Sequence, residues 1–171
     1  MAAAASNGQM ENEIFRLSVR ATHSVVKRNV EGLTHEESLI QPKPAGNCLN
    51  WIMGHLLYVY DQALPMVGQK PVMAPGTLKR YERGSVPLRN PAEALELRDL
   101  IQGWDEASNR MEAGITGITA NALDAPAPFS PSNNPNETVR SLLTVVLFHQ
   151  AYHAGQTGLL RRIAGKEGAI A

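Results

Sequence analysis

The chain has 171 residues, and its 16 Lys and Arg balance its 16 Asp and Glu to give a formal net charge of zero. A chain of this length can form one domain with a hydrophobic core, so folding itself requires no metal ion. The balanced charge and the lack of a basic run exclude the positively charged surface that nucleic-acid binding requires.

Cysteine usage and hydropathy indicate a soluble protein of the cytoplasm. Cys48 is the only cysteine, which excludes an internal disulfide and a CxxC site and is typical of a reducing compartment. We expect Cys48 to be a small buried side chain. No apolar run approaches the roughly 20 residues needed to span a bilayer, and the N-terminus lacks the order of a signal peptide. We therefore expect no membrane among the partners.

Residues 1–8 predict a disordered tail, and residues 9–171 predict one domain. The first helix is expected over residues 9–32, with Gly32 at its end. Its apolar side chains recur at spacings of three and four, at Ile14, Leu17, Ala21 and Val25. A short helical turn and a loop are expected over residues 33–46.

A second helix is expected to begin at Asn47 or Asn50, either of which can cap it, and to end before Pro65. One stripe of this helix is expected to be buried and comprises Trp51, His55, Tyr58, Val59 and Gln62. Residues 69–90 contain several Pro and Gly and follow no regular pattern. A loop of this length inside a compact domain is usually functional.

The third helix has the most regular pattern, and the pair Asn90 and Pro91 predicts its start. Its stripe follows a four-three spacing through Leu97, Ile101, Trp104, Ser108, Met111 and Ile115. A short turn over residues 119–123 and a loop over residues 124–136 then lead to a fourth helix, which ends at Gly165.

These elements predict an all-α fold, a four-helix bundle. The one strand-like run, from Val145 to Phe148, lies inside a longer helical pattern, and its length favours helix. The linker over residues 69–90 is long enough to cross the bundle, which allows the second and third helices to run parallel.

Two histidines on the fourth helix, His149 and His153, are four residues apart and share one helical face. They follow the stripe of Leu142, Val145 and Leu160, so they are expected to point into the bundle. His55 takes the equivalent inward position on the second helix. An isolated pair of this kind is equally compatible with hydrogen-bonded core residues, but three inward imidazoles favour a metal ion that satisfies their nitrogens together. His23 and His35 lie off these stripes and are expected on the surface.

Two common metal sites are excluded by the residues present. The pair is spaced as in the zincin HExxH motif, but Gln150 follows the first histidine. An amide cannot act as a general base, which removes the metalloprotease mechanism. The Glu-x-x-His pairs of a di-iron bundle are also missing.

Two segments resemble those of the DinB/YfiT-like family of four-helix bundles. Residues 50–56, Asn-Trp-Ile-Met-Gly-His-Leu, are similar to its W-x-x-G-H-L segment, and residues 149–156, His-Gln-Ala-Tyr-His-Ala-Gly-Gln, to its H-x-x-Y/H-H-x-G-Q segment. Helix number and order and the long middle linker also agree with this family across nearly the whole chain.

The resemblance implies a divalent metal ion, nickel or zinc, bound by His55, His149 and His153. It also implies an up-down-down-up topology and a homodimer. Family members of known activity use a low-molecular-weight thiol such as bacillithiol, mycothiol or glutathione, so the chain is expected to be a thiol-dependent S-transferase with a small-molecule substrate. Gln150 departs from the glutamate often found at that position, which puts an acid-base role there in doubt.

Three histidines leave an open coordination position, as in catalytic sites, where a thiol can be deprotonated. Gln156 is expected either to orient the metal-ligand shell or to pack between helices, and Tyr58 either to contact substrate or to fill the core. Five residues of the linker are expected either to lie in a solvated, charged loop or to bind an anionic thiol cofactor, and they are Lys79, Arg80, Tyr81, Arg83 and Arg89. Gly54 and Gly155 suggest close helix approach or ligand access.

Two other functions remain compatible with the same residues. One is a non-catalytic metal-binding module with a stress-response or binding role, which requires a site closed to solvent and inert to thiols. The other is a thiol-independent hydrolase or isomerase that uses the same metal ion.

Overall fold

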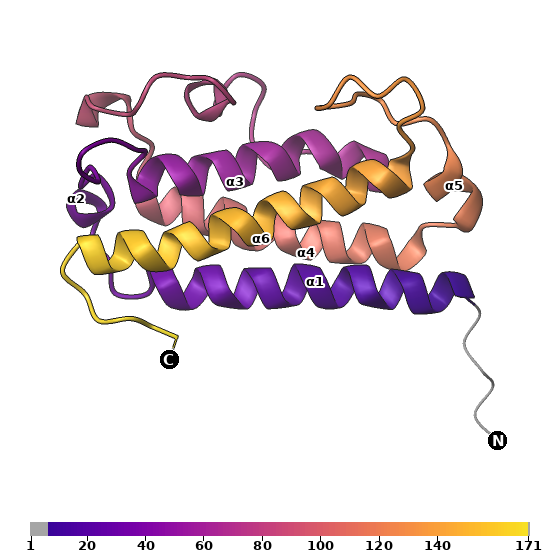
Figure 1. Ribbon diagram of the computed structural model, residues 1–171, viewed down its shortest axis with the longest axis horizontal. Helices are drawn as coiled ribbons and strands as arrows, with labels where there is room; N and C mark the ends of the chain where they lie inside the picture. The colour runs from indigo at the N-terminus through magenta and orange to yellow at the C-terminus, as the bar shows by residue number, and fades with distance from the viewer. Residues whose placement is uncertain (1–6, 171) are drawn as a thin grey trace.

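The computed structural model describes residues 7–170. Its long helices are α1 (Asn7–Val30), α3 (Leu49–Ala63), α4 (Leu97–Gly117) and α6 (Val139–Ile163), which lie side by side (Figure 1). Two short helices and three 3-10 turns connect them: α2 (His35–Ser38), α5 (Ala120–Asp124), η1 (Leu64–Val67), η2 (Lys79–Tyr81) and η3 (Pro91–Glu93). Residues 7–170 contain no β-strand. The prediction of an all-α fold is therefore confirmed.

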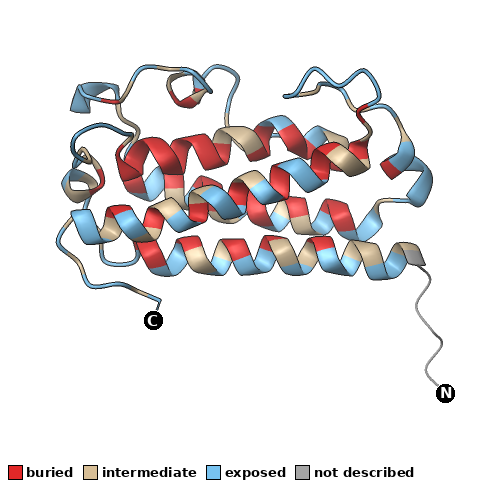
Figure 2. Cartoon of the chain, in the orientation of Figure 1, coloured by how far each residue is buried: buried red, intermediate tan, exposed pale blue. Residues whose placement is uncertain are grey.

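Each long helix packs against two others: α1 and α3 each contact both α4 and α6. Figure 2 shows the buried residues concentrated between these helices and the exposed ones on the outer faces. The linker after α3 passes along the outside of that helix and returns to the end where α3 began, so that α4 starts beside it (Figure 1). The residues described include no helix long and apolar enough to cross a membrane.

The buried face of α1 is not the one that its apolar spacing predicted. Ile14 and Leu17 are 57% and 52% exposed, whereas the buried apolar residues of this helix are Phe15, Val19, Val26 and Val30. Two polar residues, Thr22 and Asn29, are also buried on that face. Because Thr22 and Asn29 interrupt the apolar pattern of the buried face, apolar spacing alone favours Ile14 and Leu17, which lie on the outer face.

The start of α1 also differs from the prediction, since Asn7 and Gly8 belong to the helix. The rest of the predicted tail, residues 1–6, lies outside the described residues. At the other end, Gly165 has a φ of 81° just after α6, as expected of a residue that ends a helix.

Two other helix starts differ for tertiary reasons. Asn90 caps only the 3-10 turn η3, by accepting a hydrogen bond from the Ala92 amide, and α4 begins later at Leu97. The main chain of Leu95 is instead bonded to side chains, its N–H to the Tyr81 hydroxyl and its carbonyl to the Asn50 amide. Asn50 is therefore buried inside α3 and caps no helix, and the N-cap position of α3 is Cys48.

Candidate metal centre

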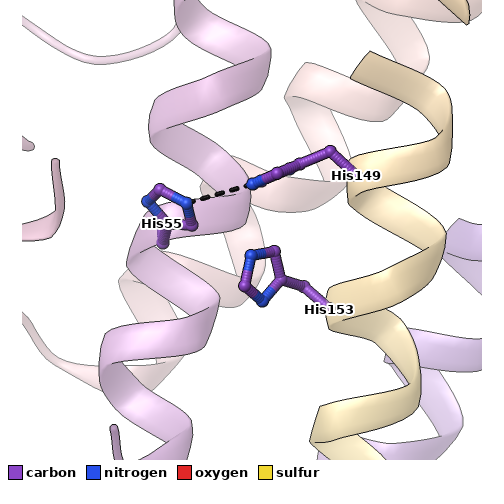
Figure 3. Close-up of side chains that lie close together, drawn as sticks. All are labelled: His55, His149 and His153. Carbon is purple, nitrogen blue, oxygen red and sulfur yellow. Dashed lines mark hydrogen bonds between the residues drawn. The ribbon is translucent and has the colours of Figure 1, made fainter. Parts of the chain in front are cut away.

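His55 on α3 and the pair His149 and His153 on α6 converge on one point between the two helices (Figure 3). Nε2 of His55 lies 3.1 Å from Nε2 of His149, and the nearest ring nitrogens of all three lie within 4.8 Å of one another. The rings meet edge to face, with centroids 4.4–5.1 Å apart. The structure thus brings together the three histidines that the sequence selected.

The orientation of His55 is fixed by a main-chain carbonyl of the linker. The Nδ1–H of His55 donates a hydrogen bond to the Tyr81 carbonyl over 2.7 Å, because that oxygen can only accept. The neutral ring therefore carries its lone pair on Nε2, which faces the other two histidines. Trp51, one turn earlier on α3, stacks on the His55 ring at 4.7 Å and supports it from the side.

Gly54 explains why Tyr81 can lie so close to α3. A Cβ at position 54 would overlap the ring of Tyr81, so only glycine admits the ring at this point. Tyr81 is fully buried, and its hydroxyl donates to Asn50 Oδ1 over 2.9 Å and accepts from the Leu95 amide over 2.8 Å. The close approach that Gly54 suggested is therefore to a linker aromatic ring, which holds the carbonyl that orients His55.

Gln156 fixes His153 in the same way. Its Oε1 accepts a hydrogen bond from His153 Nδ1–H over 2.6 Å, one turn along α6. The lone pair of His153 is thus also on Nε2. A hydrogen-bond acceptor on the outer nitrogen of a histidine ligand is the usual arrangement around metal ions in proteins.

His149 differs because its Nδ1 is buried and has no hydrogen-bond partner among the described residues. The neighbouring Gln150 holds this part of α6 against α3, since its amide donates to the Leu56 carbonyl over 2.9 Å. Gln150 is fully buried and does not line the cavity next to the histidines. The Gln150 side chain therefore links α6 to α3 and does not face the cavity.

Burial keeps the three imidazoles neutral. Desolvation, reinforced by the nearby His153, His55 and Arg83, lowers the pKa of His149 to about 4. Desolvation also lowers the pKa of His55 and of His153, although each gains some compensation from its acceptor, the Tyr81 carbonyl or Gln156. Neutral imidazole is the form that binds a metal ion, so the site is in the binding state at neutral pH.

The cluster opens into a cavity of about 810 Å³, which is lined by α3, α6 and parts of three connecting segments, residues 42–47, 83–84 and 129–131. All five residues of the stripe predicted on α3 line it, so this stripe faces the cavity. On α6 the wall includes Val145, which was expected in the core but is 45% exposed beside the cavity. The volume lies in the range of small-molecule sites, and most of the wall is apolar.

The remaining candidates lie as follows. Tyr58 lines the cavity, with its ring 6.3 Å from that of His55. His23 pairs with Asp105 and His35 accepts from the Leu97 amide, both away from the cluster and only partly exposed. Cys48 is buried, as expected. Gly155 is exposed, with no described atom near the position of a Cβ, so close helix approach does not explain it.

Sequence reasoning missed the Tyr81 carbonyl, which is the closest partner of His55. Every residue has a main-chain carbonyl, so the residue type at position 81 does not indicate that its carbonyl bonds a histidine. The available signal was Gly54 inside a helix, next to a histidine, because such a glycine indicates that another group lies against the helix.

The donor set fits a divalent ion. Two nitrogens bound to one tetrahedral Zn²⁺ at about 2.0–2.1 Å are about 3.3 Å apart, close to the 3.1 Å between His55 Nε2 and His149 Nε2. The three histidines therefore have the chemistry of a divalent-metal site, and the pair His55 and His149 also has its spacing.

Comparison with known proteins agrees with this architecture. No curated protein matches the chain. Among solved structures, it is similar to a conserved protein from Enterococcus faecalis, with a TM-score of 0.69 and 18% identity, over 95% of this chain and 100% of that one. This likeness shows the fold. The family model of the DinB superfamily matches residues 19–157, a span that contains all three histidines, and the chain belongs to that superfamily.

Proposed function

We propose that the protein is a divalent-metal-dependent enzyme in which His55, His149 and His153 are the ligands. The observation that carries this proposal is that two of the three rings use Nδ1 for a hydrogen bond to another residue. His55 and His153 each donate Nδ1–H to an oxygen acceptor, so that their Nε2 lone pairs are both left for one ion. Nickel and zinc are the metals we favour, because both accept imidazole ligands.

The reaction we propose is the transfer of a low-molecular-weight thiol to a small electrophile. A divalent ion held by three histidines acts as a Lewis acid and can lower the pKa of a thiol enough for it to react at neutral pH. The protein contributes three neutral ligands, a mostly apolar wall that limits water, and the Tyr58 hydroxyl as a hydrogen-bonding group in the cavity. The open cavity supports an enzyme over a purely structural site, since structural metal sites are closed.

The proposal extends to architecture and location. The return of the linker along α3 supports an up-down-down-up order of the four long helices.

The exposed apolar residues on the outer face of α1, Met10, Ile14 and Leu17, support a homodimer. We place this dimer in the cytoplasm. Light scattering of the wild-type protein and of Leu17→Lys tests the dimer, because a charge on this face should give a monomer.

Metal analysis of protein purified without an affinity tag tests the metal site. We expect close to one nickel or zinc ion per chain in the wild type and in the control His23→Ala, whose histidine pairs with Asp105 elsewhere. His149→Ala and His153→Ala should lose the metal and stay folded. Metal-free wild-type protein that cannot be reloaded would overturn the proposal.

Thiol consumption tests the reaction. Metal-loaded protein is mixed with bacillithiol or glutathione and an electrophile such as 1-chloro-2,4-dinitrobenzene, and the loss of free thiol is followed. We expect turnover by the wild type and none by His149→Ala. A protein that holds its metal but consumes no thiol would instead support a metal-binding module or a thiol-independent reaction.

A further inference from the structure

Arg83 is the only charged residue among those that line the cavity. Its guanidinium makes no hydrogen bond or ion pair with any residue that the structure describes. The neighbouring Arg80, in contrast, bonds Glu93 and the carbonyls of Val86 and Pro87. Arg83 is thus an exposed, unpaired cation on an otherwise uncharged wall that the three histidines also line.

The backbone that carries Arg83 is held on both sides. Two residues before it, the buried Tyr81 ring lies against Gly54. Two residues after it, Ser85 Oγ accepts a hydrogen bond from Trp51 Nε1–H over 2.9 Å. The main chain of Arg83 is therefore held beside the cavity by the same contacts that support His55, and only the exposed side chain has to be ordered when a ligand binds.

The cavity has no group of its own to balance positive charge. None of its lining residues is Asp or Glu. The three imidazoles are neutral, so a divalent ion on them would keep its full charge. Arg83 adds a second positive site on the cavity wall, where its side chain is exposed. The cavity wall is mostly apolar, with Ile52, Val59 and Val146 among its residues.

We infer that the substrate of this cavity is a small, mainly apolar molecule with one acidic group, which pairs with Arg83 while its reacting end faces the histidines. The guanidinium can bind a carboxylate through two parallel hydrogen bonds, which gives both affinity and orientation. The part of this inference that concerns the reacting end rests on the proposed function. The pairing of the acidic group with Arg83 does not.

A pair of probes of equal shape tests the inference. The affinities of 4-phenylbutyrate and of 4-phenylbutanamide are measured by calorimetry on the full chain after the metal has been removed by chelation and dialysis. We expect the wild type to bind the acid about tenfold more tightly than the amide. Arg83→Gln should reduce this ratio to about one. The control Arg89→Gln changes an exposed linker cation that does not line the cavity, and it should keep the wild-type ratio.

The inference is overturned if the wild type binds both probes equally, if it binds neither at millimolar concentration, or if Arg83→Gln keeps the preference. Metal content is measured separately on the same variants. Arg83→Gln should load metal as the wild type does. Loss of the proposed metal site would leave the probe ratio intact, so the two proposals can fail independently.

Discussion

The ring of Tyr81 occupies the space that a Cβ at Gly54 would require. Through this contact a linker residue passes beside α3, and its carbonyl oxygen reaches Nδ1 of His55 at 2.7 Å. Gly54 and His55 of the first family segment thus both depend on Tyr81 of the linker. Gly54 leaves room for the Tyr81 ring, and the Tyr81 carbonyl orients His55.

Gly54→Ala should therefore damage both stability and the metal site. The added methyl group must displace the buried Tyr81 ring, and overpacking of this kind costs about 1–3 kcal/mol. The displaced carbonyl would no longer orient His55, and loss of such a partner lowers metal affinity by about 10–100-fold. Urea unfolding and a competitive metal titration measure the two effects.

Gly155→Ala is the matched control, because the position is exposed and helical and nothing described lies near a Cβ there. It should raise the free energy of unfolding by up to about 1 kcal/mol through helix propensity. Equal behaviour of the two variants would contradict the role we assign to Gly54.

Removal of the Gln156 acceptor should weaken metal binding without unfolding the protein. Gln156→Leu leaves His153 Nδ1–H without its partner at 2.6 Å, so we expect about a 10–100-fold loss of metal affinity. Gln156→Glu keeps an acceptor oxygen and should retain most of it. The control is Gln62→Leu, another glutamine of the cavity wall that contacts no histidine, and an affinity loss of the same size there would argue against a specific role for Gln156.

The metal-free protein should lose stability as the pH falls from about 6.5 to about 4. The pKa of His149 is about 4 in the fold and 6.5 ordinarily, so the unfolded chain binds more protons in this interval. The free energy of unfolding then rises with pH through the same interval and is lost on acidification. Urea midpoints at pH 7 and pH 5 should differ more in the wild type than in His149→Gln, and equal differences would contradict the lowered pKa.

Gln150→Glu should destabilise the protein and should not create a hydrolase. The Gln150 amide donates to the Leu56 carbonyl, and its Oε1 is buried without a partner. A carboxylate there would face a carbonyl oxygen with no donor, which costs about 1–3 kcal/mol or more. Gln150→Met keeps the volume and removes the unpaired oxygen, so its unfolding midpoint should stay closer to that of the wild type. Hydrolysis of esters or peptides by Gln150→Glu would refute this placement.

The α6 half of the centre was predictable because its information is local. A spacing of four residues places His149 and His153 on one helical face, and Gln156 lies within one turn of His153. The convergence of His55 with them required only that α3 and α6 present these stripes to each other, which the packing of the two helices provides.

The errors arose where tertiary contacts override local pattern. The core face of α1 contains Thr22 and Asn29, and the Asn29 amide bonds Thr157 of α6 over 2.9 Å. The spacing of apolar residues cannot indicate that such a polar pair is buried. α4 begins later than predicted for the same reason. The main-chain N–H and carbonyl of Leu95 form hydrogen bonds with the side chains of Tyr81 and Asn50 and so take no part in a helical turn.

The two oriented histidines depend on different kinds of acceptor. His55 relies on a carbonyl of the main chain, which every amino acid at position 81 would carry, whereas His153 relies on the amide of a side chain. A single base change in the codon for Gln156 can therefore remove the acceptor of His153, whereas no substitution at position 81 removes the carbonyl that His55 uses. Of the two oriented histidines, His153 is thus the one whose orientation a single mutation of its acceptor can change directly, in evolution or in the laboratory.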